Sequence, residues 1–378
     1  MHHRRVRTLH ANTVMKPLHL ALQGGGSHGA FTWGVLDALL QEEEFGLPSL
    51  SGSSAGALNA VALASGWSVA ARTGGDRRGG ARETLRGVWE EVMSLGAFGA
   101  LQRQWLSAWI GTAALARWPS GPALGFHPLE HLLRRHIDFA ALQDHGTPAV
   151  HVGATHVRSG RAKIFSAAAV TLDAVLASTC LPALFPTVFV DGEAYWDGGY
   201  SANPPLSPFL ALDGPVDVLL VQINPMTAAV PGTMHDVQQR AQELAFNAGL
   251  LSQVRALAHI NQLVALGLLP AGRMIRLHRI SGGDDLQRFP ASSRASADAG
   301  VIRELFALGR EAAERWVADC GPQVGLRATL DAREYADDTW LRLGAPASPV
   351  ASWRLRAWPR LRAMVEALRR RGDADRAQ

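Results

Sequence analysis

A serine flanked by two glycines is the first candidate for chemistry in this chain. Gly52, Ser54 and Gly56 form a Gly-x-Ser-x-Gly pattern in front of a run that suits a helix. In a nucleophile elbow a strand ends at such a serine, the chain turns sharply and a helix begins, which exposes the hydroxyl. The glycines leave room for the crossing backbone. Amides at the helix start, beginning with Ala55, would stabilise an oxyanion, so the sequence predicts Ser54 as a nucleophile.

A glycine-rich loop precedes this serine by 28 residues and allows two interpretations. Its glycines and serine are Gly24, Gly25, Gly26, Ser27 and Gly29. The spacing matches a dinucleotide fingerprint, with Glu44 where a ribose-binding acid is expected. That acid should end a second strand, whereas residues 42–44 form a polar run at the end of a predicted helix. The alternative is an anion-binding loop whose amides form an oxyanion hole. We favour it because a predicted strand over residues 47–50 leads directly into the serine elbow.

An aspartate at the end of a predicted strand is the second candidate for chemistry. Asp197 is followed by Gly198 and Gly199. Such a turn can present a carboxylate where backbone passes close by. Asp191-Gly192 in the same stretch is interpreted as an ordinary turn.

The hydrophobic pattern predicts the elements that must position these residues. Strands are expected over residues 18–22, 47–50, 150–157, 162–165, 188–190, 194–196, 216–223 and 274–280. Helices are expected over residues 30–41, 55–69, 83–93, 171–178, 236–268 and 301–317, with Thr171 and Asp298 as N-caps and a loop over residues 73–80. Apolar strands alternating with helices indicate an α/β protein with a mainly parallel sheet.

Composition and charge exclude several classes of protein. Hydrophobic residues make up 47% and charged residues 19% of 378, which is ordinary for a globular enzyme. The basic surplus lies at the two ends, in residues 1–16 and 352–378, rather than on the body where a nucleic-acid enzyme would carry it. The two cysteines, Cys180 and Cys320, support neither a disulfide framework nor a zinc ribbon. His127 and His131 have the spacing of a metal pair but no partnered carboxylate pattern, so no metal site is predicted.

Three further segments carry predictions. Residues 1–14 are interpreted as a disordered leader, with Met15 as an alternative start, and no secretory signal is apparent. Residues 98–126 are rich in tryptophan and almost uncharged, which indicates an apolar cap, with contact to lipid as the sharper alternative. Residues 352–371 interleave apolar residues with arginines, which suits either a solvated helix or an interfacial helix on anionic lipid. We expect one catalytic domain over residues 15–320 and an extension over residues 321–378.

Taken together and in this order, the glycine loop with Gly34-Val35-Leu36, the serine elbow through Asn59 and the Asp197-Gly198-Gly199 turn resemble the patatin-like phospholipase family. Residues 177–186 and Asn203-Pro204 support the resemblance, which covers residues 17–225 well. It implies a three-layer α/β/α fold and a catalytic dyad without histidine. In that dyad Ser54 would be the nucleophile and Asp197 its base, with the amides of residues 24–26 as oxyanion hole.

One position departs from the family pattern. The family often has arginine or lysine where this chain has His28. A fixed cation beside the loop would then be replaced by a group that titrates near neutrality, which weakens the expected contact with an anionic head group.

A Ser-Asp-His triad is the alternative within the same chemistry. It requires a histidine after Asp197, namely His235, His259 or His278, and none lies in a recognisable catalytic loop. The resemblance implies hydrolysis of phospholipid or lysophospholipid esters through an acyl-enzyme, without a cofactor. Other interpretations are a non-phospholipid esterase, lipase or polyester hydrolase with the same dyad, a membrane-surface adaptor with a silent hydrolase fold, and a dinucleotide-dependent oxidoreductase. A cytoplasmic protein that contacts the inner membrane surface peripherally is expected; the oligomeric state stays open.

Overall fold

The computed structural model of the chain describes residues 15–95, 128–182, 185–289, 293–294 and 297–335. The predicted leader, the apolar segment over residues 98–126 and the basic segment over residues 352–371 lie outside the described residues. The chain divides into two compact units, residues 1–332 and 333–378. Residues after 320 contact the rest of the first unit, since the Gly325 amide donates to Asp217 Oδ1 at 3.0 Å and the Thr329 amide to the Leu277 carbonyl at 3.1 Å.

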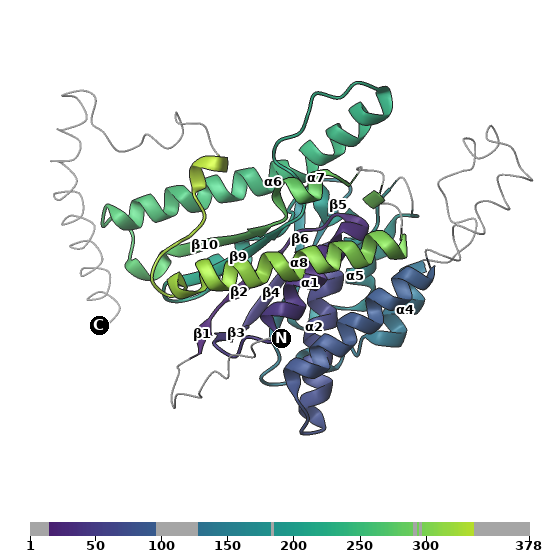
Figure 1. Ribbon diagram of the computed structural model, residues 1–378, viewed down its shortest axis with the longest axis horizontal. Coiled ribbons are helices and arrows are strands. Elements are labelled where there is room, and N and C mark those ends of the chain that lie inside the picture. The colour runs from purple at the N-terminus through teal and green to yellow at the C-terminus, as the bar shows by residue number, and fades with distance from the viewer. Residues whose placement is uncertain (1–14, 96–127, 183–184, 290–292, 295–296, 336–378) are drawn as a thin grey trace, which may run out of the picture. The chain divides into compact units, whose positions relative to one another are not determined.

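An eight-stranded sheet forms the centre of the first unit, in the order β10-β9-β2-β4-β5-β8-β7 with β6 paired to β5 (Figure 1). These strands are β2 (His19–Leu22), β4 (Ser49–Ser53), β5 (Ala149–His156), β6 (Ala162–Ser166), β7 (Val188–Val190), β8 (Glu193–Asp197), β9 (Val216–Gln222) and β10 (Ile275–Ser281). The run from β10 to β5 is parallel, and the pairs that join β6, β7 and β8 to the sheet are antiparallel. A separate parallel pair joins β1 (Lys16–Pro17) to β3 (Phe45–Gly46).

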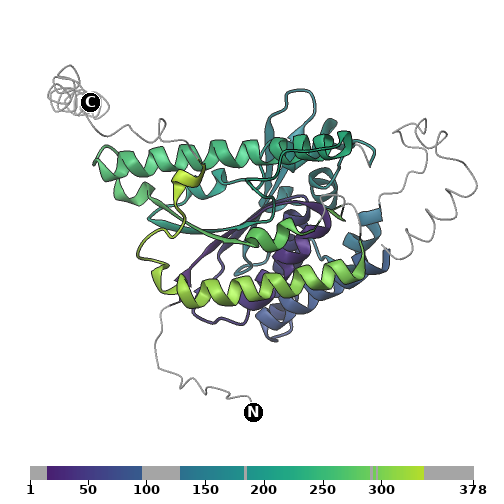
Figure 2. The ribbon, with the colours of Figure 1, turned by 45° about the horizontal axis from the view of Figure 1, so that its top comes forward.

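Helices cover both faces of this sheet, which confirms the α/β prediction. The helices are α1 (Gly29–Leu39), α2 (Ala55–Arg72), residues 77–95, α4 (Pro128–His136), α5 (Leu172–Ser178), α6 (Met234–Ala265), α7 (Gly283–Gln287) and α8 (Ala299–Asp319). In Figure 2, α6 lies on one side of the sheet while α1 and α8 lie on the other. The predicted caps are present, because Thr171 accepts from the Ala174 amide at 3.2 Å and Asp298 from the Val301 amide at 2.9 Å.

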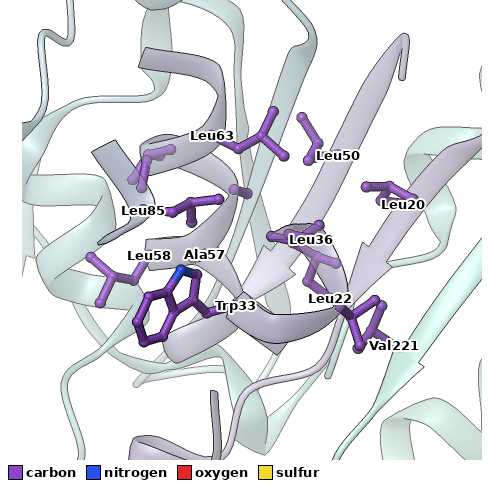
Figure 3. Close-up of a cluster of buried hydrophobic side chains, with 14 of the residues drawn as sticks. Leu20, Leu22, Trp33, Leu36, Leu50, Ala57, Leu58, Leu63, Leu85 and Val221 are labelled. Carbon is purple, nitrogen blue, oxygen red and sulfur yellow. The ribbon is translucent and has the colours of Figure 1, made fainter. Parts of the chain in front are cut away.

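The main core lies between the sheet and helices α1 and α2 (Figure 3). Leu20, Leu50 and Val221 of three neighbouring strands meet Leu36 of α1 and Leu63 of α2, and all five are fully buried. Burial of each such side chain contributes about 1.5–3 kcal/mol. Helix α2 is buried on almost every side over residues 55–66, which suits its alanine-rich sequence. The core therefore packs together the two layers that the serine elbow connects.

The loop predicted over residues 73–80 is shorter than expected. A helix covers residues 77–95, so residues 77–80 are helical. Asp76 Oδ1 accepts from the Arg78 amide at 3.0 Å and caps this helix start. Gly80 packs against α2, since a Cβ there would lie 2.6 Å from the Gly66 carbonyl oxygen. Gly80 therefore serves helix packing instead of a turn, which a local pattern does not distinguish.

Candidate active site

Ser54 lies on a sharp turn between β4 and α2. Its backbone angles are φ 55° and ψ −127°, and α2 begins at the next residue. Positive φ is costly for a non-glycine residue and is found where the surrounding structure fixes it. A Cβ at Gly52 would lie 2.4 Å from the Gly56 carbonyl carbon, and one at Gly56 would lie 2.0 Å from the Leu22 oxygen. The two glycines are therefore required by the crossing backbone, as the elbow pattern predicts.

The register of β5 brings Asp197 to the serine. Ser53, the last residue of β4, is opposite Gly153 of β5, and Asp197, the last residue of β8, is opposite the next residue, Ala154. Strand β6 occupies the other edge of β5, so β8 continues the edge where β4 ends. Thr155 Oγ1 donates to the Asp197 carbonyl at 2.8 Å and fixes this strand end. Two residues separated by 143 positions are thus adjacent by strand pairing.

The Asp197 carboxylate is fully buried and incompletely hydrogen-bonded. Oδ1 accepts from the Gly199 amide at 2.7 Å, whereas Oδ2 has no aligned donor among the described residues. Burial raises the pKa of Asp197 to about 7, and the nearby hydroxyl of Ser54 and the bonded Gly199 amide oppose this rise. A carboxylate with this pKa, one oxygen unsatisfied and a serine hydroxyl beside it is suited to accept a proton at neutral pH.

Ser178, at the end of α5, positions the serine elbow and was not singled out by the sequence as a site residue. Its Oγ accepts from the Ser54 amide at 3.0 Å and donates to the Gly153 carbonyl at 2.6 Å. Because the Ser54 amide is already bonded, an oxyanion would be stabilised by other amides. The next amide, Ala55, stands at the N-terminus of α2, where partial positive charge collects.

The glycine loop lies against the elbow on the other side of Ser54. A Cβ on Gly24 would lie 2.6 Å from the Ser54 Cβ, so the two segments are in contact. The expected role of the Gly24 amide is corrected by the structure, since this amide donates to Asn203 Oδ1 at 2.6 Å. Gly25 and Gly26 follow with no acceptor for their amides among the described residues. Ser27 continues into a short 3-10 helix, Gly26–His28.

A buried network of amide side chains fixes this loop, and local sequence patterns hardly indicate it. Asn203 Nδ2 and Asn224 Nδ2 donate to the Gly24 carbonyl at 3.2 and 2.8 Å. Gln23 Oε1 accepts from the amides of Ile223 and Asn224, and its Nε2 donates to Asn247 Oδ1 at 3.1 Å. Gln23 stands directly before the glycines and Asn203 directly before a proline, which are the only local signals. Each partner comes from a different segment, so the loop depends on the complete fold.

His28 differs from the expectation that it titrates near neutrality. The side chain is 1% exposed, and burial together with the nearby Arg294 lowers its pKa to about 3. Its Nε2 is bonded to Ser293 Oγ at 2.7 Å. A histidine with such a pKa is neutral at pH 7 and is a weaker base than the Asp197 carboxylate. His28 therefore contributes neither a positive charge nor the general base.

The histidines that follow Asp197 give no support to a triad. Both ring nitrogens of His278 are bonded elsewhere, to Asp217 Oδ1 and to Thr329 Oγ1, each at 3.0 Å. His259 lies within α6, and the side chain of His235 is outside the described set. His278 is thus excluded as the histidine of such a triad, because both of its ring nitrogens are bonded to other residues.

The dinucleotide and metal interpretations also lack their structural requirements in the described residues. Glu44 precedes the two-residue strand β3, outside the main sheet, and pairs with Lys16 at 3.6 Å. It therefore does not end a second strand of the sheet as a ribose-binding acid would. Over the described ranges, no group of three or more histidine, cysteine, aspartate or glutamate side chains could hold a metal ion.

A family model matches the part of the chain that contains Ser54 and Asp197. Residues 20–210 match the family model described as patatin-like phospholipase. Among solved structures, VipD from Legionella pneumophila is similar at 14% identity, with a TM-score of 0.30, over 78% of this chain and 67% of that chain. No curated protein matches the sequence. Within the described helices, none is long and apolar enough to cross a membrane.

Proposed function

The chain belongs to the patatin-like phospholipase family, a family of lipid acyl hydrolases, and from this premise we propose that it cleaves lipid carboxylic esters through Ser54 and Asp197. The substrates proposed first are phospholipids and lysophospholipids. One observation carries the proposal: the strained elbow serine lies beside a buried carboxylate whose pKa is raised to about 7. A non-phospholipid esterase, lipase or polyester hydrolase would use the same dyad.

The dyad would work in two half-reactions. Asp197 takes the hydroxyl proton of Ser54 while Oγ attacks the ester carbonyl carbon, and the amides of Gly25, Gly26 and Ala55 stabilise the oxyanion. The tetrahedral intermediate collapses, the ester C–O bond breaks, and Asp197 returns the proton to the leaving alcohol. Water then loses a proton to Asp197 and attacks the acyl-enzyme carbonyl carbon. The acyl C–O bond to Ser54 breaks, the fatty acid leaves, and Asp197 returns the proton to Ser54 Oγ.

Labelling by a fluorophosphonate probe tests this proposal. We expect the wild-type protein to be labelled at Ser54 and to hydrolyse p-nitrophenyl butyrate. Ser54→Ala should lose both properties while keeping its circular dichroism spectrum, and the exposed Ser207→Ala should lose neither. Absence of labelling in a folded wild-type protein would refute the proposal and favour the silent adaptor. The cytoplasmic location and the membrane contacts of residues 98–126 and 352–371 remain predictions.

The pH dependence of hydrolysis tests the role of Asp197. Because burial raises the pKa of Asp197 to about 7, the base form is a minor species at pH 5. We expect kcat/KM for p-nitrophenyl butyrate to rise about tenfold per pH unit below 7 and to level off above it. Measurement between pH 5 and 9, with spontaneous hydrolysis subtracted, checks this. A profile that is flat across pH 5–8 would contradict a base with a raised pKa.

A further inference from the structure

An ion cluster beside the glycine loop has no part in the reaction as described. Arg294 Nη1 donates to Glu243 Oε1 at 2.7 Å, and Arg240 Nη1 donates to Glu243 Oε2 at 2.9 Å. The exposed fractions of these side chains are 19%, 18% and 9% for Arg294, Arg240 and Glu243. One carboxylate therefore serves two guanidinium groups, so the cluster keeps a positive charge in a half-buried place where solvent screens it weakly.

Arg294 lies directly against the loop. A Cβ on Gly26 would be 2.2 Å from the Arg294 carbonyl oxygen and 3.5 Å from its Cβ. The preceding residue, Ser293, is bonded to His28 at 2.7 Å. On the α6 side, Glu243 lies one turn before Asn247, the partner of Gln23. The arginine is thus held at the end of the sheet where the candidate nucleophile stands.

The guanidinium of Arg294 still has bonding capacity. Its Nε is buried and has no hydrogen-bond partner among the described residues. Arg240 differs, because its second nitrogen also donates to the Met226 carbonyl at 3.1 Å. The charge of Arg294 reaches the loop, since it contributes to the lowered pKa of His28. A partly unpaired guanidinium beside a predicted oxyanion hole is suited to bind phosphate oxygens.

We propose that Arg294, oriented by Glu243, binds the phosphate of a glycerophosphate ester whose acyl carbonyl lies at the Gly25–Gly26 amides. This rests on the proposed function and narrows its substrate class to acyl esters with an anionic phosphate. In this proposal Arg294, which lies 266 residues after His28, supplies the fixed positive charge that position 28 lacks. Arg294 acts as a specificity residue in this proposal and takes no part in bond breaking.

A matched pair of substrates tests the proposal. With the same acyl chain and below micelle formation, kcat/KM is measured for 1-acyl-glycerol 3-phosphate and for 1-acyl-glycerol. We expect the wild type to prefer the phosphate ester, and Arg294→Gln to lower that preference about 10-fold or more, mainly through KM. Arg294→Lys should recover part of it. Arg315→Gln, which removes an exposed charge paired with Glu311 on α8, should leave the preference close to that of the wild type.

Failure of this inference is distinguishable from failure of the proposed function. A wild type that labels with fluorophosphonate yet shows no preference, or an Arg294→Gln protein that loses both substrates equally, overturns the inference alone. A folded wild type that does not label removes both. If Arg294→Gln does not fold, inhibition of wild-type p-nitrophenyl butyrate hydrolysis decides: sn-glycerol 3-phosphate should compete and glycerol should not. Equal effects of the two compounds would overturn the proposal.

Discussion

Asp197→Asn is expected to abolish ester hydrolysis and, at the same time, to make the protein more stable above neutral pH. The amide keeps the acceptor for the Gly199 amide but cannot take a proton from Ser54. Loss of a positioned general base lowers the rate by about 10³-fold or more. A gain in stability together with this loss of activity would show that Asp197 serves catalysis and does not stabilise the fold.

The stability gain follows from the raised pKa of Asp197. The pKa of its carboxyl is 3.8 in the unfolded chain and about 7 in the folded protein. Between pH 4 and 7 the folded state therefore binds more protons than the unfolded state. The free energy of unfolding therefore falls as pH rises through this window, and above pH 7 the fold carries a buried charge. Each pKa unit corresponds to about 1.4 kcal/mol. The free energy of unfolding of the variant should therefore exceed that of the wild type by up to about 4 kcal/mol at pH 8 and by little near pH 4.

Urea unfolding of both proteins at pH 4, 6 and 8 measures this difference. Subtracting the free energy of unfolding of the wild type from that of the variant cancels the contributions of groups that titrate alike in both proteins. The variant must be checked by mass spectrometry, because an asparagine before Gly198 can deamidate to aspartate and restore activity. A variant that is equally destabilised at all three pH values would show that Asp197 is a structural acceptor, and hydrolysis that survives the change would exclude it as the base.

Local sequence patterns are sufficient to predict most of the helices and strands and to single out Ser54 and Asp197 as candidate reactive residues. The pattern predicts a strand leading into the elbow, the turn at Ser54 and the helix starting at Ala55, although the strand covers Ser49–Ser53 instead of residues 47–50. It also predicts the strands β5 and β6 and the caps Thr171 and Asp298. These features are determined within a few residues by hydrophobic period, glycine placement and side-chain bonding to nearby amides. The pattern therefore indicated both which residues could react and which elements hold them.

Long-range contacts account for the parts that the sequence did not predict. The Gly24 amide is bonded to Asn203, 179 residues away, which removes it from the expected oxyanion hole. His28 has a typical sequence context, yet burial and Arg294 lower its pKa to about 3. Hydrogen-bond pairing and desolvation depend on the assembled fold, whereas a motif records only residue types. The same limit applies to Arg294, because only the structure shows that it lies against the glycine loop.

Gly56→Ala should destabilise the protein strongly although alanine is the better helix former. In an open helix the change would favour folding by about 1 kcal/mol. Here the added Cβ would lie 2.0 Å from the oxygen and 2.7 Å from the carbon of the Leu22 carbonyl. That carbonyl belongs to β2, whose pairing with β4 and β9 prevents it from moving away. We expect a loss of about 3 kcal/mol or more in the free energy of unfolding.

Gly232→Ala is the matched control, since a Cβ there meets no atom within 4 Å. It should be neutral or stabilising by up to about 1 kcal/mol. Urea midpoints at pH 7 measure both variants, and hydrolysis of p-nitrophenyl butyrate measures the elbow. Moving α2 away from β2 also moves Ser54 away from Gly25 and Gly26, and misplacement by about 1 Å can cost about 10²-fold in rate. If Gly56→Ala were as stable and active as Gly232→Ala, the close crossing of β2 and α2 would not hold the nucleophile in place.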